Sequence, residues 1–131
     1  MMKPVLRTFA LCVLLVAVAG CRVEQVMTVE NAALNPPASA TDDEISKAIR
    51  LAGTTLGWQM IQQAPGQIEG TLRLRRHDAV VNVAYDRKAF SIRYKNSTNL
   101  NYNASDGTIH SNYNGWVTNL KNAIQANVAA I

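Results

Sequence analysis

Three consecutive runs between residues 67 and 95 alternate apolar with polar side chains, and this pattern constrains the fold more than any other. The apolar positions are Ile68, Gly70, Leu72 and Leu74, then Val81, Val83 and Tyr85, then Phe90, Ile92 and Tyr94. A period of two is typical of a strand with one buried face and one wet face. The short polar turns at 76–78 and 86–88 join the runs as antiparallel hairpins, so the sequence predicts a three-stranded meander.

A helix is predicted before this meander. Thr41 and Glu44 have the spacing of a capping box, and Asp42 and Asp43 place negative charge in the first turn. Gly57 is a plausible C-terminal stop. The apolar stripe of this helix is Ile45, Ala48, Ile49, Ala52 and Leu56.

A second, longer helix is predicted after a stretch of turn-forming residues at 96–107. Its apolar stripe is Ile109, Tyr113, Trp116, Val117, Leu120, Ile124 and Val128. Two amphipathic helices and a sheet with one apolar face predict an α+β domain over residues 41–131. We expect a two-layer sandwich, helix, three-stranded meander, helix, with both helices on one face of the sheet.

The first 20 residues have the pattern of a secretory signal peptide. Lys3 and Arg7 precede an apolar run from Phe9 to Ala19. This run is too short for a membrane-spanning helix, which needs about 20 apolar residues. Removal of residues 1–20 lowers the net charge from +4 to +2, because Lys3 and Arg7 leave with the signal.

Cys21 follows small residues at the end of this apolar run. The stretch Val18-Ala19-Gly20-Cys21 resembles the bacterial lipoprotein signal, in which the cysteine receives diacylglycerol, the chain is cut before it and the new amine is acylated. Only a thiolate is nucleophilic enough to take the lipid. Several acyl chains on one residue give stable anchoring. The resemblance implies a lipid-anchored protein, and Arg22 after the cysteine favours the outer membrane, facing the periplasm.

Residues 21–40 are expected to form a flexible tether behind the lipidated cysteine. No clear period runs through this segment, and Asn35-Pro36-Pro37 favours extended backbone.

Positive charge is concentrated in the predicted sheet. Residues 67–95 hold seven basic and three acidic residues. Four basic residues alternate outward and are candidate ligands for anionic envelope polymers: Arg73, Arg75, Arg93 and Lys95. The alternative, which is the commoner reason for charges on an open sheet face, is that they keep the protein soluble and protect the sheet from edge pairing. The envelope location disfavours nucleic acid as a partner.

Catalytic chemistry has few candidates in this chain. His110 is a candidate acid/base group, and Tyr113 and Trp116 are candidates for stacking on a sugar, but we favour a local hydrogen bond near the helix start for His110 and a place in the core for the aromatic residues. Ser91 or Ser111 with a histidine shows no diagnostic spacing. His77 and His110 alone do not predict a metal site. We expect no enzyme and no cofactor, with a small hydrolase using His110 as the alternative.

Scattered aromatic and glycine positions between residues 45 and 124 resemble a group of small proteobacterial lipoproteins of unknown function. The resemblance rests on Gly57-Trp58, Gly66-Gln67-Ile68, Ile92-Arg93-Tyr94, Ile109-His110, Tyr113-Asn114, Trp116 and Leu120. It implies a compact domain on a lipid anchor and brings no site residues. The sequence therefore predicts a non-enzymatic binding or envelope-maintenance module, bound to the bilayer through Cys21 and partnered by an envelope polymer or another envelope protein.

Overall fold

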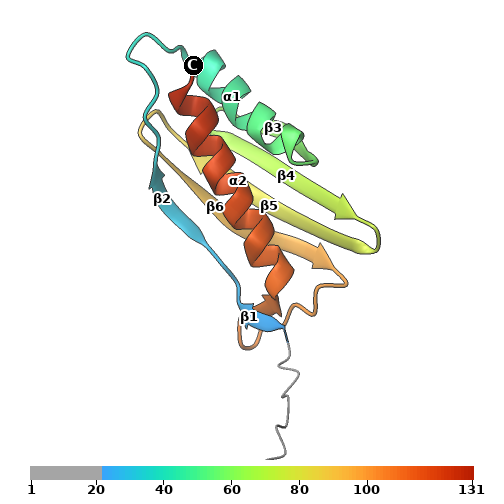
Figure 1. The fold of residues 1–131 in the computed structure, drawn as a ribbon. Coiled ribbons are helices and arrows are strands. Elements are labelled where there is room, and N and C mark those ends of the chain that lie inside the picture. The colour runs from blue at the N-terminus through green and yellow to red at the C-terminus, as the bar shows by residue number, and fades with distance from the viewer. Residues whose placement is uncertain (1–21) are drawn as a thin grey trace, which may run out of the picture.

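The computed structural model describes residues 22–131, and the predicted signal segment and Cys21 lie outside this range. Nine elements follow one another in this part of the chain (Figure 1): β1 (Val23–Gln25), β2 (Val29–Ala33), α1 (Asp42–Thr55), β3 (Trp58–Ala64), β4 (Gln67–Leu74), β5 (His77–Tyr85), β6 (Ala89–Thr98), β7 (Thr108–His110) and α2 (Ser111–Ala129). The α+β class predicted from the sequence is confirmed.

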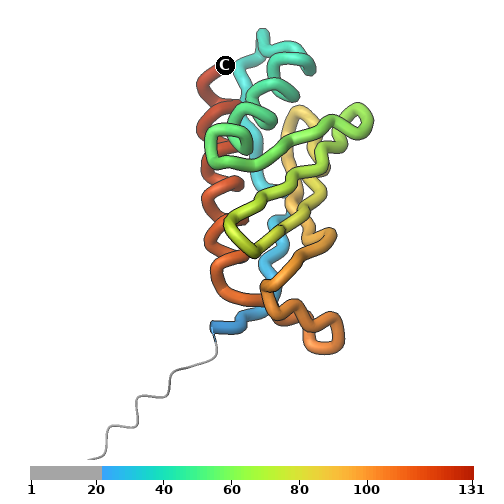
Figure 2. The backbone as a smooth tube through the Cα atoms, turned by 90° about the vertical axis from the view of Figure 1, so that its right-hand side faces the viewer, coloured from blue at the N-terminus to red at the C-terminus, as the bar shows by residue number. Residues whose placement is uncertain are grey.

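The main sheet has five antiparallel strands in the order β2-β6-β5-β4-β3, and β1 pairs with β7 in a separate two-stranded sheet. Both helices lie on one side of the main sheet, and the other side is open (Figure 2). The predicted count of three strands is therefore wrong. β3 was missed because its inward-facing Trp58 and Met60 are followed by an apolar residue that faces outward, Ile61.

The tether predicted for residues 21–40 is also wrong where the structure describes it. Val29 pairs with Ile92 of β6, and Leu34 donates its backbone N–H to the carbonyl of Lys88 over 2.8 Å. Val29, Leu34 and Ala40 are buried in the core. The segment shows no period because β2 is short and its register shifts at a bulge, where Asn31 adopts a positive φ of 49°.

Helix α1 begins as predicted. The hydroxyl of Thr41 accepts from the backbone N–H of Glu44, and the Glu44 carboxylate accepts from the backbone N–H of Thr41. Gly57 follows the helix with a φ of +90°, which explains why a glycine ends it. Four of the five predicted stripe residues are buried, whereas Leu56 at the C-cap is exposed.

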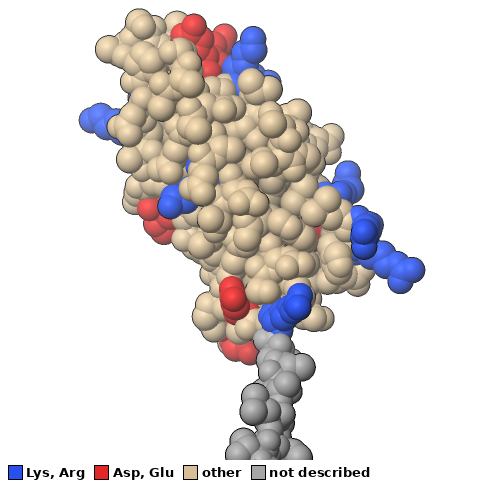
Figure 3. Space-filling model, in the orientation of Figure 1, with Lys and Arg blue, Asp and Glu red and all other residues tan. Residues whose placement is uncertain are grey.

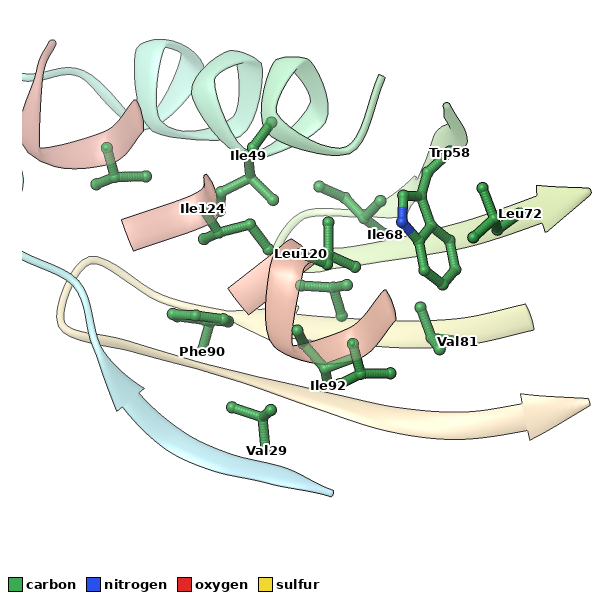
Figure 4. Packing of buried hydrophobic residues seen from close by; sticks show 14 of the residues in the cluster. Val29, Ile49, Trp58, Ile68, Leu72, Val81, Phe90, Ile92, Leu120 and Ile124 are labelled. Carbon is green, nitrogen blue, oxygen red and sulfur yellow. The ribbon is translucent and has the colours of Figure 1, made fainter. Parts of the chain in front are cut away.

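The core lies between the helices and the inner face of the sheet. Figure 4 shows Ile49 of α1 and Leu120 and Ile124 of α2 among side chains of the strands, such as Ile68 and Val81. Tyr113, Val117 and Val128 complete the buried stripe of α2, and Trp116 is partly buried against the core. Ile109 is buried as well, but it belongs to β7.

Candidate functional site

Two of the four predicted basic residues form ion pairs on the open face of the sheet. Arg93 donates from Nε and Nη2 to the two carboxylate oxygens of Glu30, over 3.0 and 2.8 Å. These hydrogen bonds lower the pKa of the Glu30 carboxyl. Lys95 donates to Glu69 on β4. Arg93 and Lys95 thus each have a carboxylate partner.

The remaining predicted residues lie at the turn between β4 and β5. Arg73 is near the end of β4, and Arg75 stands in the two-residue turn between the paired residues Leu74 and His77. We call residues 73–76 the arginine tip. Asp78 faces Arg73 in the β4–β5 register, but none of the three arginines forms an ion pair with any residue between 22 and 131. Figure 3 shows basic side chains grouped at this edge of the molecule.

Leu74 and Arg76 of the tip were not among the candidates from the sequence. Leu74 follows the alternation of its strand, yet 42% of it is exposed because the strand ends there. The signal was the interruption of the period of two at Arg76, although the turn predicted at 76–78 lies at residues 75 and 76 in the structure.

His110 caps helix α2. Its Nδ1 accepts from the backbone N–H of Asn112 over 3.1 Å. The candidate serines do not assist it: Ser91 is buried and its Oγ accepts from the backbone N–H of Asn31. His77 lies elsewhere, with Nδ1 at 2.8 Å from the carbonyl oxygen of Asn99. Within residues 22–131 no cluster of three metal-ligating side chains occurs.

Tyr113 of α2 is not available for stacking on a sugar, and Trp116 is partly buried against the core. Tyr113 is fully buried, where its hydroxyl has no hydrogen-bond partner among the described residues, and burial raises its pKa. Its ring meets Tyr94 edge to face at 5.7 Å between centroids, and Tyr94 stacks on Tyr102 at 4.1 Å. Only Tyr102 of these three is exposed.

A pocket lies at the end of the sheet opposite β1, and we call it the distal pocket. It has a volume of about 500 Å³ between the start of α1, the β3–β4 turn and the β5–β6 turn. Its size falls within the range of small-molecule sites, roughly 300–1,000 Å³. Its lining residues are Asp42, Asp43, Ile45, Ser46, Gln62, Gln63, Ala64, Pro65, Gly66, Tyr85, Asp86 and Arg87.

Hydrogen bonds between side chains hold the wall of this pocket. Ser46 donates to Oε1 of Gln62 over 2.8 Å, and Nε2 of Gln62 donates to the Tyr85 hydroxyl over 2.9 Å. These two hydrogen bonds connect α1, β3 and β5. None of these residues was predicted as a site residue, because only the sheet register and the helix position bring them together.

Charge in the distal pocket is mainly negative. Asp42 accepts from Arg87 over 2.9 Å, and Asp86 accepts from the backbone N–H groups of Lys88 and Ala89, which lower the pKa of its carboxyl. Asp43 forms no hydrogen bond through its side chain with the described residues. The pocket thus has three carboxylates against one guanidinium.

No protein-family model, curated protein or solved structure matches this chain. The resemblance to small proteobacterial lipoproteins therefore stays a prediction. Neither helix within residues 22–131 is long and apolar enough to cross a membrane.

Proposed function

We propose that this protein is a lipid-anchored, non-enzymatic binding module of the bacterial envelope, attached to the outer membrane through acylated Cys21 and facing the periplasm. The signal-like segment before Cys21 supports this proposal. The partner is another envelope protein or an envelope polymer.

The observation that carries the proposal is that the folded domain begins at Arg22, the residue that follows Cys21 in the sequence. Strand β1 begins at Val23, and two residues of extended chain span only about 7 Å. The backbone N–H of Ser111 donates to the carbonyl of Arg22 over 2.6 Å. Asn114 of α2 adds hydrogen bonds to Glu24 and to the backbone of Gln25 and Met27. A lipid on Cys21 therefore holds this end of the domain at the bilayer surface.

The opposite end then points away from the membrane. Figures 1 and 2 both show the start of α1 and the β3–β4 and β5–β6 turns at the end of the molecule remote from β1. The distal pocket lies among these elements, with a fixed wall and an excess of carboxylates. We expect it to receive a segment of the partner that presents a positively charged group.

Membrane fractionation of Cys21→Ser tests the anchor. The variant is expected to leave the membrane fraction or to accumulate as uncut precursor, whereas Cys12→Ser, the only other cysteine variant that the chain offers, should fractionate like the wild type. Wild-type fractionation of Cys21→Ser would refute the anchor.

Photo-crosslinking in living cells tests the binding role of the distal pocket. A photoreactive residue at Gln63, which lines the pocket, is expected to capture one discrete partner. Asn119, on the exposed side of α2, is the matched control position. Equal capture from both positions, or none from Gln63, would contradict a binding site in the pocket.

A further inference from the structure

We propose that the arginine tip is a second membrane contact, in which Arg73, Arg75 and Arg76 bind the phosphates of anionic lipids and Leu74 enters the headgroup region. This inference rests on the proposed anchor at Cys21. A second contact surface would fix the orientation of the domain relative to the bilayer.

Hydrogen bonds connect the tip to the loop that leads to β7, beside β1. Nδ2 of Asn99 donates to the carbonyl of Arg76 over 2.7 Å, and the Asn99 carbonyl lies 2.8 Å from Nδ1 of His77. The loop that begins at Asn99 leads directly to β7, the partner strand of β1. Figures 1 and 2 agree, because in both the β4–β5 turn lies nearer to β1 than the β3–β4 and β5–β6 turns do.

The composition of the tip suits an anionic bilayer surface. Guanidinium groups form paired hydrogen bonds with phosphate oxygens, and basic residues are attracted to anionic headgroups. Leu74 is a large apolar side chain, 42% exposed, in the middle of these arginines. Six large apolar side chains are exposed within residues 22–131, and Leu74 is the one that lies among three arginines. An apolar residue within a basic cluster is the combination by which peripheral segments bind the membrane interface.

The backbone conformation at Arg75 also supports a function for the arginine tip. Its φ is +56°, a region that non-glycine residues rarely occupy. Asparagine and glycine are preferred in two-residue hairpin turns for this reason. An arginine held in such a conformation at an exposed position indicates that its charge has a use, since strained residues cluster at functional sites.

Fluorescence quenching on vesicles tests the contact. The mature lipidated chain has no free thiol, because its only cysteine is Cys21. Leu74→Cys and, as the far-end control, Gln63→Cys are each labelled with an environment-sensitive fluorophore. The full lipidated protein is placed in vesicles of phosphatidylcholine alone or mixed with phosphatidylglycerol, each with a headgroup-nitroxide lipid as quencher.

We expect quenching at position 74 to exceed that at position 63 and to increase with phosphatidylglycerol. Adding Arg75→Asn and Arg76→Gln to Leu74→Cys should lower the equilibrium constant of the contact by about 30-fold, given the attraction of each basic residue to an anionic surface. Added salt should act in the same direction.

Three outcomes would overturn the proposal. The first is equal quenching at positions 74 and 63. The second is quenching at position 74 that does not increase with phosphatidylglycerol. The third is a change in the fluorescence of the label at position 74 when purified peptidoglycan is added in place of vesicles. Flotation of the vesicles separates this failure from failure of the anchor: without lipid on Cys21 the wild-type protein does not float with neutral vesicles, and mass measurement shows an unmodified thiol.

Discussion

The hairpin turns at the two ends of the main sheet differ in backbone conformation and in charge. At the far end the β3–β4 turn uses Gly66 at a φ of +76°, beside a pocket with three carboxylates. At the near end the β4–β5 turn uses Arg75 at a φ of +56°, between two other arginines. The far turn is conformationally relaxed and the near turn is strained but cationic. The comparison teaches that the β4–β5 turn carries an arginine at a backbone position that glycine fits better, whereas the β3–β4 turn has the glycine.

The far turn is expected to be the more sensitive to a side chain. In Gly66→Ala the new Cβ lies 2.8 Å from the carbonyl oxygen of Tyr85, and the positive φ disfavours alanine. The free energy of unfolding should fall by about 2 kcal/mol or more, measured by urea denaturation. Gly115→Ala is the control, because nothing lies within 4 Å of its Cβ in α2. If Gly66→Ala were as stable as the wild type, the relaxed far turn would be the wrong description.

At the near end His110→Ala should lower the free energy of unfolding by about 1 kcal/mol, since it removes the cap of α2. His110→Asn keeps an N-cap acceptor and should retain most of the stability. Equal loss in both variants would argue against capping. Hydrolytic turnover by the wild type that disappears in both folded variants would instead support the hydrolase hypothesis.

Tyr113 buries a hydroxyl without a partner near the same end. Tyr113→Phe should leave the stability at pH 7 unchanged or raise it by up to about 1 kcal/mol. Because burial raises the pKa of Tyr113, its hydroxyl ionises first in the unfolded chain, and stability is lost as the pH rises above about 10. Alkaline unfolding should be shallower in the phenylalanine variant, and an unchanged pH profile would contradict burial of the hydroxyl.

Arg75→Gly separates strain from charge at the tip. Relief of the positive φ, less the greater flexibility of glycine in the unfolded chain, should raise the free energy of unfolding by about 0.5 kcal/mol. The same variant should weaken tip contact with phosphatidylglycerol vesicles. Asn101→Gly, at a φ of 52°, changes a similar backbone position without removing a charge and should keep the contact. A loss of contact in both variants would assign the effect to the backbone.

The smallest change in stability is expected for Glu30→Gln combined with Glu69→Gln. Both ion pairs are exposed, and such pairs contribute little to folding. The double variant frees Arg93 and Lys95, so it should need more salt for elution from a cation-exchange resin. Glu30→Asp with Glu69→Asp keeps the charges and should elute like the wild type. Identical elution of all three proteins would show that the pairs do not mask the cations.

Local signals carried much of the fold prediction. Thr41 and Glu44 form the predicted capping box, Gly57 has the predicted role after α1, and β4, β5 and β6 occupy the alternating segments. β2 could not be found in this way, because its place depends on a bulge at Asn31 whose backbone N–H donates to Ser91, 60 residues further on.

The ion pairs of the candidate site could not be predicted, because they join strands that are far apart in the sequence. Glu30 belongs to the segment expected to be a tether, so nothing local indicated that it lies beside Arg93. The distal pocket likewise depends on the packing of α1 against the hairpin turns. The arginine tip could be predicted in part from the sequence, since Arg73 and Arg75 are candidate residues and the turn interrupts a regular period.

The pairing of β1 with β7 determines how the domain responds to mechanical force on its anchor. Tension on Cys21 reaches first the short ladder from Val23–His110 to Gln25–Thr108 and the hydrogen bonds of Asn114. The force reaches the five-stranded sheet only at β2. Under a pull the small ladder should therefore open before the sheet does, lengthening the connection by several residues while the domain stays folded.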